Sequence, residues 1–176
     1  MRRLADDEIH VWTVPRAWEP TAREILRDYT GTRAGLRRSP LGKPFVPGGG
    51  LEVGISGTTG LTVLALCRHP FGIDVERVAP LDGLDTLCAL TLAPAEAGEM
   101  ACLPPGVQAA RFYRIWVRKE ALLKARGCGL AADPRELDTS RPMGRWRWLD
   151  AERDGVAVAA AVHHSPCRLV WMGAAR

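Results

Sequence analysis

Hydrophobic and polar positions along the chain follow two periods, one typical of strands and one typical of helices. Several short runs are rich in β-branched, aliphatic and aromatic residues and are bounded by Gly or Pro, which predicts strands. The expected strands are 9–14, 51–56, 61–67, 71–78, 145–150, 155–162 and 168–173. Only a short Gly- and Thr-containing segment separates the second strand from the third, so these two form a predicted hairpin.

Three other stretches have a helical pattern. They are 21–30, 81–102 with a break near Pro94, and 107–126. Gly31 and Gly127 directly follow the first and last of these, where glycine commonly ends a helix. Residues 37–50 are dense in Pro and Gly, so we expect an irregular loop there.

The order of these elements predicts an α+β protein. Residues 1–79 and 80–176 each contain one helical region and about three strands, so they read as two half-domains of similar layout. No low-complexity linker separates them, and we expect the halves to pack as one unit. A length of 176 residues suits one domain or two small half-domains.

Composition excludes several classes of protein. With 47% hydrophobic residues and 25% charged residues, the chain is not a disordered, collagen-like or disulfide-scaffold protein. We find no apolar run of about 18 residues and no secretory signal, so a membrane span is not expected. The five cysteines include no C-x-x-C pair, which favours reduced thiols in the cytosol. A net charge of +4 is compatible with an acidic partner without selecting one.

Two pairs of ionisable residues have spacings that can carry chemistry. Asp74 and Glu76 are two apart in a predicted strand and therefore lie on one face, while Glu120 and Lys124 share a helix face. The alternatives are acids on a solvent-exposed edge strand and an ordinary surface ion pair. The long helix has an extensive apolar surface, which favours a packed position. Three carboxylates from a strand and a packed helix would suit Mg²⁺ together with a substrate phosphate.

The lysines draw attention to the same segments. Only three of the 24 basic residues are lysines: Lys43, Lys119 and Lys124. Each would serve as a point charge for phosphate groups.

Three motifs in this chain resemble those of a known enzyme family. Gly-Ile-Asp-Val-Glu at 72–76 is similar to the G-I-D-x-E motif of the Sfp-type 4′-phosphopantetheinyl transferases. Residues 116–125, WVRKEALLKA, are similar to that family's W-x-x-K-E-A-x-x-K-A motif, and 42–44 match its G-K-P turn. The motifs occur in the family's order and at roughly its separations.

The resemblance implies an enzyme that transfers phosphopantetheine from coenzyme A to a serine of an acidic apo carrier protein, releasing 3′,5′-bisphosphoadenosine. It implies a monomer of two similar α+β halves related by a pseudo-twofold axis, with coenzyme A in the cleft between them. No nucleic acid or membrane partner is expected.

The resemblance also implies roles for single residues. Asp74, Glu76 and Glu120 would hold Mg²⁺, and Glu120 would also act as the general base. Lys124 would bind the pyrophosphate and act in catalysis, with Lys119 adjacent to the same site. The remaining predicted contacts to coenzyme A are Arg23, Lys43, Pro44, Ser56 and Thr58.

Two departures from the family pattern concern coenzyme A binding. The family has a histidine in an N-I-S-H-S segment after the G-K-P turn, and Gly57 stands at that position here, between Ser56 and Thr58. The stretch between Val14 and the first helix is also shorter than the basic stretch usual in the family.

Other functions compatible with the sequence are a metal-dependent phosphodiester hydrolase built on the same three acids and a basic nucleic-acid module. The nucleic-acid hypothesis rests on the excess of arginine and on Trp146 and Trp148, which alternate with arginines as in a half-buried strand. A protein that binds coenzyme A without catalysis is a further alternative, suggested by Gly57. A soft-metal site at His163, His164 and Cys167 is not favoured, because no second ligand cluster has the required spacing.

Overall fold

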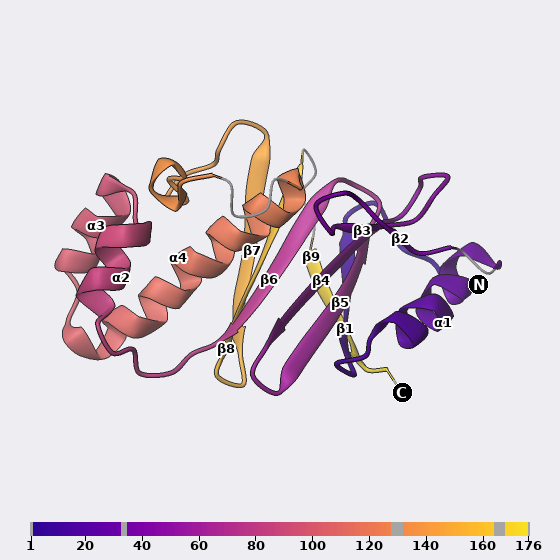
Figure 1. Ribbon diagram of the computed structural model, residues 1–176, viewed down its shortest axis with the longest axis horizontal. Coiled ribbons are helices and arrows are strands. Elements are labelled where there is room, and N and C mark those ends of the chain that lie inside the picture. The colour runs from indigo at the N-terminus through magenta and orange to yellow at the C-terminus, as the bar shows by residue number, and fades with distance from the viewer. Residues whose placement is uncertain (1, 33–34, 128–131, 164–167, 176) are drawn as a thin grey trace.

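Two β-sheets pack face to face in the computed structural model, and each has a helix on its outer side (Figure 1). The structure describes residues 2–32, 35–127, 132–163 and 168–175. The helices in this part of the chain are α1 (Glu19–Thr30), α2 (Leu84–Thr91), α3 (Pro94–Ala101), α4 (Pro105–Arg126) and the short 3₁₀ helix η2 (Pro134–Glu136). Gly31 and Gly127 end α1 and α4 with φ values of 70° and 67°, in the left-handed conformation that favours glycine.

The first sheet has the strand order β2-β3-β4-β5-β1-β9, and the second has the order β6-β8-β7. The strands are β1 (Glu8–Val14), β2 (Arg37–Arg38), β3 (Pro44–Phe45), β4 (Glu52–Thr58), β5 (Leu61–Cys67), β6 (Phe71–Arg77), β7 (Trp146–Arg153), β8 (Val156–His163) and β9 (Arg168–Ala174). Neighbouring strands are antiparallel except for β1 and β9, which are parallel. The predicted α+β class, the hairpin and the helix break at Pro94 are therefore confirmed.

The two sheets do not divide at residue 79. β6 comes from the first predicted half and lies in the second sheet, while β9 comes from the second half and pairs with β1 in the first sheet. Each of the halves 1–79 and 80–176 thus contributes strands to both sheets. This exchange joins the halves through backbone hydrogen bonds as well as through packing.

Three hydrophobic clusters hold the layers together. Side chains from the inner faces of both sheets form the central cluster, which includes Ile9, Val63, Phe71, Ile73 and Val158. A second cluster joins α1 to the outer face of the first sheet, and a third joins α4 to the outer face of the second sheet. Burial of these apolar faces is the main favourable contribution to folding.

Trp146 and Trp148 are half-buried and pack against the cluster under α4, as expected for the inner face of a strand. They are therefore committed to packing, and the base-stacking function considered above has no support from their placement.

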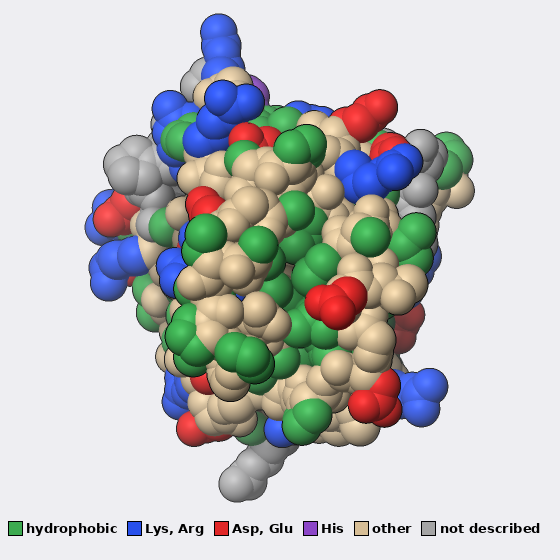
Figure 2. Space-filling model, turned by 90° about the vertical axis from the view of Figure 1, so that its left-hand side faces the viewer, with side chains coloured by type: hydrophobic (Ala, Val, Ile, Leu, Met, Phe, Trp, Pro, Cys, Tyr) green, Lys and Arg blue, Asp and Glu red, His purple; other side chains and the backbone are tan. Residues whose placement is uncertain are grey.

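No helix among the described residues is long and apolar enough to cross a membrane. Figure 2 views the molecule from the side of α2 and α3, where hydrophobic side chains line a hollow between charged groups. Exposed Leu90 belongs to α2 and exposed Val107 to α4.

The unpaired side of β4 and the edge strand β6 meet where the sheets come together. After its first residue, β4 has no strand partner among the described residues on the side away from β5, and β6 is an edge strand of the second sheet. Ser56 Oγ accepts a hydrogen bond from the backbone N–H of Val75, at 3.3 Å, and Thr58 Oγ1 accepts one from that of Arg77, at 3.4 Å. Side-chain hydroxyl groups therefore take the place of a backbone ladder and bring the hydroxyls of β4 against β6.

Candidate active site

Six predicted site residues come together where β4, β6 and α4 meet. Asp74 and Glu76 lie on β6, Ser56 and Thr58 on β4, and Glu120 and Lys124 on α4. The strand period of two directs both β6 carboxylates to the same side, and the four-residue spacing places both α4 side chains on one helix face.

Gly72 allows α4 to lie this close to β6. A Cβ atom at residue 72 would be 2.2 Å from the carbonyl oxygen of Ala121 and 2.4 Å from the backbone nitrogen of Ala125. Any larger residue would therefore displace the helix that carries Glu120 and Lys124.

Direct contacts connect the three elements. Lys124 Nζ lies 2.5 Å from Asp74 Oδ1 and 2.9 Å from Ser56 Oγ. The Ser56 hydroxyl is 2.7 Å from the same Asp74 oxygen, and the Thr58 hydroxyl donates to Glu76 Oε2 at 2.8 Å. Each β6 carboxylate therefore has a hydroxyl partner from β4, and Asp74 has the ammonium group as well.

Burial dominates the electrostatics of the cluster. It raises the pKa of Asp74 above its ordinary value, although the Lys124 charge acts in the opposite direction. Burial also raises the pKa of Glu120, with Asp74 and Glu76 adding to the effect and Lys124 opposing it. The pKa of Glu76 is raised for the same first reason, while its hydrogen bond from Thr58 lowers it. Three carboxylates share one ammonium group, so the cluster favours additional positive charge.

Two carboxylate oxygens in the cluster have no partner. Asp74 Oδ2 and Glu120 Oε1 are buried and make no hydrogen bond in the part of the chain that the structure describes. Among those residues no three His, Cys, Asp or Glu side chains converge closely enough to hold an ion as they stand. The unpartnered oxygens and raised pKa values nevertheless fit a hard divalent cation, which takes carboxylate oxygen ligands.

Two cavities flank Lys124. The larger has a volume of about 950 Å³ and lies along β4, where Ser56 and Thr58 line it. The smaller has a volume of about 180 Å³ and is bordered by Lys43 and Pro44 from the G-K-P turn. Lys124 borders both cavities, so four of the predicted coenzyme A contacts, Lys43, Pro44, Ser56 and Thr58, line cavities that include this lysine.

Lys43 connects the G-K-P turn to the elements of the cluster. Its Nζ donates to the carbonyl oxygens of Phe71, at 3.3 Å, and Ala125, at 3.1 Å. Ala125 lies in the last turn of α4, where carbonyl groups lack partners within the helix. Burial lowers the pKa of Lys43, and Glu52, 3.9 Å away, opposes this shift.

Lys119 does not lie with the other predicted site residues, which corrects its expected place beside Lys124. Its side chain is fully buried on another face of α4 and forms an ion pair with Glu96 at 2.6 Å. Its Nζ also donates to the carbonyl oxygens of Pro134 and Leu137, both at 2.7 Å. The three N–H groups of the ammonium are thus used inside the protein and are not available to a phosphate.

Arg23 lies on α1 with an exposed side chain and borders neither of these cavities. Arg16, in the short segment after β1, lines the larger cavity instead. The sequence gives no signal for Arg16, because an isolated arginine in a loop belongs to no pattern. Tyr113 precedes Glu120 by seven residues on α4; burial raises its pKa, and the Glu76 charge adds to this shift.

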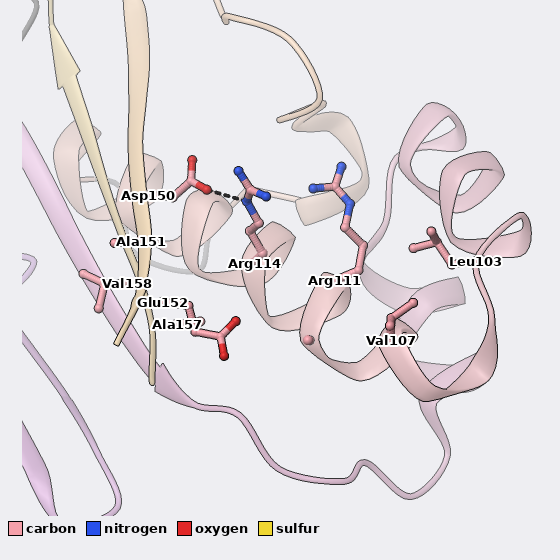
Figure 3. A pocket seen from close by; sticks show the side chains of 10 residues that line it. Leu103, Val107, Arg111, Arg114, Asp150, Ala151, Glu152, Ala157 and Val158 are labelled. Atoms are coloured by element: carbon pink, nitrogen blue, oxygen red, sulfur yellow. Dashed lines mark hydrogen bonds and ion pairs between the residues drawn. The ribbon is translucent and has the colours of Figure 1, made fainter. Parts of the chain in front are cut away.

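A third cavity, of about 450 Å³, lies between α4, β7 and β8 (Figure 3). No predicted site residue lines it. Its two arginines already have acidic partners, since Arg114 pairs with Asp150 and Arg111 pairs with Glu99. Two residues of the disfavoured soft-metal site, His164 and Cys167, lie outside the described residues.

A family model described as the 4′-phosphopantetheinyl transferase superfamily matches residues 70–160. The chain belongs to the 4′-phosphopantetheinyl transferase superfamily. The match includes β6 and α4, which carry the acids of the cluster and Lys124. It confirms the resemblance stated from the motifs.

Named members of this superfamily are similar to the chain over part of their length. The chain is 29% identical over 157 residues to the 4′-phosphopantetheinyl transferase HetI of Nostoc sp., which is 78% of this chain and 65% of that protein. It is 35% identical over 104 residues to the 4′-phosphopantetheinyl transferase AcpT of Salmonella typhimurium, covering 57% and 53% of the two chains. It is 31% identical over 91 residues to a 4′-phosphopantetheinyl transferase of Bacillus subtilis, covering 51% and 40%. The chain therefore spans less than two thirds of the length of these relatives.

Proposed function

We propose that this chain transfers the 4′-phosphopantetheine group of coenzyme A to a serine of an apo carrier protein. The observation that supports this most directly is the cluster of Asp74, Glu76 and Glu120 around Lys124, with a cavity on either side of the lysine. Membership of the superfamily adds the reaction class. The proposed products are the holo carrier protein and 3′,5′-bisphosphoadenosine.

Glu120 is the proposed general base. It accepts the proton of the carrier serine hydroxyl as the serine oxygen forms a bond to phosphorus. The phosphorus–oxygen bond to the nucleotide then breaks, and 3′,5′-bisphosphoadenosine leaves with the bonding electron pair. The raised pKa of Glu120 makes its carboxylate a stronger proton acceptor than an exposed glutamate. Lys124 places a positive charge where negative charge increases on the pyrophosphate oxygens.

Asp74, Glu76 and Glu120 would hold Mg²⁺, as their carboxylate chemistry and the two unpartnered oxygens suggest. When bound, Mg²⁺ neutralises charge on phosphate oxygens and orients them for displacement. Ser56 and Asp74 keep Lys124 in place through their contacts with Nζ. Glu76 is oriented by its hydrogen bond from Thr58.

For coenzyme A we propose contacts along the region bordered by both cavities. Lys43 and Pro44 are proposed at the smaller cavity, and Ser56 and Thr58 at the larger one. Arg23 remains a proposed contact to the adenosine phosphates only if the nucleotide extends to α1. Two related half-domains, 1–79 and 80–176, with coenzyme A between them are also part of the proposal, supported by the helix on the outer side of each sheet.

The proposed partner is an acidic carrier protein, in keeping with the net charge of +4. A monomer is sufficient for this reaction, because a single chain supplies the whole cluster. The test is incubation with coenzyme A, Mg²⁺ and a panel of apo carriers, followed by mass spectrometry of the carriers. A mass gain of one phosphopantetheine group, lost in Glu120→Gln, is expected. Absence of transfer to every carrier contradicts the proposal, and release of phosphopantetheine without a carrier would favour the phosphodiester hydrolase.

A further inference from the structure

A buried ion pair lies one residue before the proposed base, on a different face of the same helix. Lys119 and Glu96 have no exposed side-chain area, and their charged groups are 2.6 Å apart. The mechanism proposed above uses neither residue. Buried charges are costly unless they are paired and hydrogen-bonded, so the role of this pair needs a specific reason.

All the polar atoms of the pair have partners. Glu96 Oε1 accepts hydrogen bonds from the backbone N–H and the hydroxyl of Thr139, both at 2.8 Å. Glu96 Oε2 accepts from the backbone N–H of Ala93 at 2.9 Å, in addition to the Lys119 ammonium. Together with the two carbonyl contacts of Lys119, these bonds join α4 to the start of α3 and to residues 134–139. A fully satisfied network of this kind is directional and rigid.

The position of the network relative to the site is fixed by helix geometry. Successive residues of an α-helix are about 100° apart around the axis, so a rotation of α4 that moves Lys119 also moves Glu120. On its other side α4 rests on Gly72, where the Ala121 carbonyl oxygen lies 2.2 Å from a hypothetical Cβ. The helix is thus held from two sides around the residue that would accept the serine proton.

Hydrophobic contacts alone would resist such a rotation less well, because they are non-directional. We propose that the Lys119–Glu96 pair is a positioning device that sets the rotation of α4 and thereby the directions of Glu120 and Lys124. This inference rests on the proposed function for its consequences in catalysis. Lys119 is then a positioning residue, whereas the family resemblance placed it beside coenzyme A.

The main test compares two double variants of α3 and α4. Lys119→Met/Glu96→Gln removes both buried charges together, so that neither is left uncompensated. Arg111→Met/Glu99→Gln is the matched control, because it removes a partly exposed ion pair between the same two helices, about two turns from the site. Thr139→Val is a milder variant that removes one hydrogen bond to Glu96 and keeps the ion pair.

With coenzyme A and a carrier, well below the melting temperature, we expect kcat of the buried-pair variant to fall at least about tenfold. The KM for coenzyme A should change less than about twofold, and the acidic limb of the pH–kcat profile should shift because Glu120 has moved. The kcat of Thr139→Val should lie between that of the buried-pair variant and that of wild type. The kcat of the Arg111→Met/Glu99→Gln control should match that of wild type. An unchanged kcat, or a rise in KM with kcat unchanged, overturns the proposal. If the buried-pair variant does not fold, Thr139→Val replaces it: a lower kcat than wild type supports the proposal, and an unchanged kcat overturns it.

Amide hydrogen exchange separates this proposal from the proposed function. Exchange in residues 117–126 should be faster in the buried-pair variant than in the control at equal global stability. Unchanged exchange there overturns the positioning role, whether or not the wild-type chain transfers phosphopantetheine. Faster exchange together with an inactive wild type would contradict the proposed function and leave the positioning of α4 supported.

Discussion

A Cβ atom on Gly72 would lie 2.2 Å from the carbonyl oxygen of Ala121, so α4 rests directly on the backbone of β6. This contact fixes the separation between the strand that carries Asp74 and the helix that carries Glu120 and Lys124. The second glycine-dependent approach is at Gly54, where a Cβ atom would be 2.9 Å from the ring of Phe71. Both glycines have ordinary φ values, so their role is one of space.

Gly72→Ala should therefore destabilise the protein by about 3 kcal/mol, the upper end of the cost of overpacking, because backbone atoms cannot move aside like a flexible side chain. The measurement is urea unfolding at neutral pH. Gly57→Ala is the control, since Gly57 is exposed on β4 and its Cβ would be 3.3 Å from Thr62 Oγ1 on β5. Equal stability of the two variants would contradict this account of the β6–α4 contact.

Lys124→Met should reduce transfer by about 100-fold or more, because it removes the positive charge beside Asp74 and the proposed pyrophosphate. Circular dichroism should show an unchanged fold. Arg126→Met provides the comparison, because Arg126 is exposed in the same last turn of α4 and should be dispensable. Activity that survives in the Lys124 variant would remove it from the proposed machinery.

Gly57→His should strengthen coenzyme A binding, because it introduces the histidine that the family resemblance leads us to expect at this position, beside the proposed phosphate contacts. A single added charge-assisted hydrogen bond of about 1.5 kcal/mol corresponds to roughly a tenfold lower Kd. A side chain fits at residue 57 once Thr62 Oγ1 shifts by a few tenths of an ångström. Titration calorimetry of both proteins checks the prediction, and an affinity no better than that of Gly57→Ala would refute it.

Glu120→Gln should make the protein more thermostable at pH 8 while abolishing transfer. The pKa of Glu120 is raised in the folded protein by burial, Asp74 and Glu76, so the folded state binds more protons than the unfolded state between the two pKa values. Stability from this group is therefore present at low pH and declines as pH rises through the folded pKa. The gain in melting temperature should be larger at pH 8 than at pH 4, and the opposite order would contradict the assigned shift.

Arg16→Ala should raise the KM for coenzyme A more than Arg23→Ala. Arg16 lines the cavity that also contains Ser56 and Thr58, whereas Arg23 does not. A charged hydrogen bond to a phosphate contributes about 1.5–3 kcal/mol, so we expect an effect of roughly tenfold or more for Arg16. A larger effect for Arg23 would place the nucleotide nearer α1 than we propose.

Local patterns accounted for most of the secondary structure and for four residues of the cluster, whereas Ser56 and Thr58 were expected only from the family resemblance. The Asp74–Glu76 and Glu120–Lys124 spacings each specify a shared face, because strand and helix periods are local properties of the backbone. Helical spacing places Lys119 and Lys124 on different faces of α4, but it does not say which of these faces other elements enclose. Their different positions depend on which face of α4 is covered by α3 and residues 134–139.

The sequence by itself determined the superfamily motifs, the α+β class and the pairs of residues that share a face. Only the tertiary structure decided that β6 joins the second sheet, that β9 returns to the first, and that Lys119 is enclosed with Glu96. It also decided that Arg16, and not Arg23, borders the larger cavity. The physical reason is that the period of a helix or strand fixes directions within that element, whereas contacts between distant segments depend on how several elements pack together.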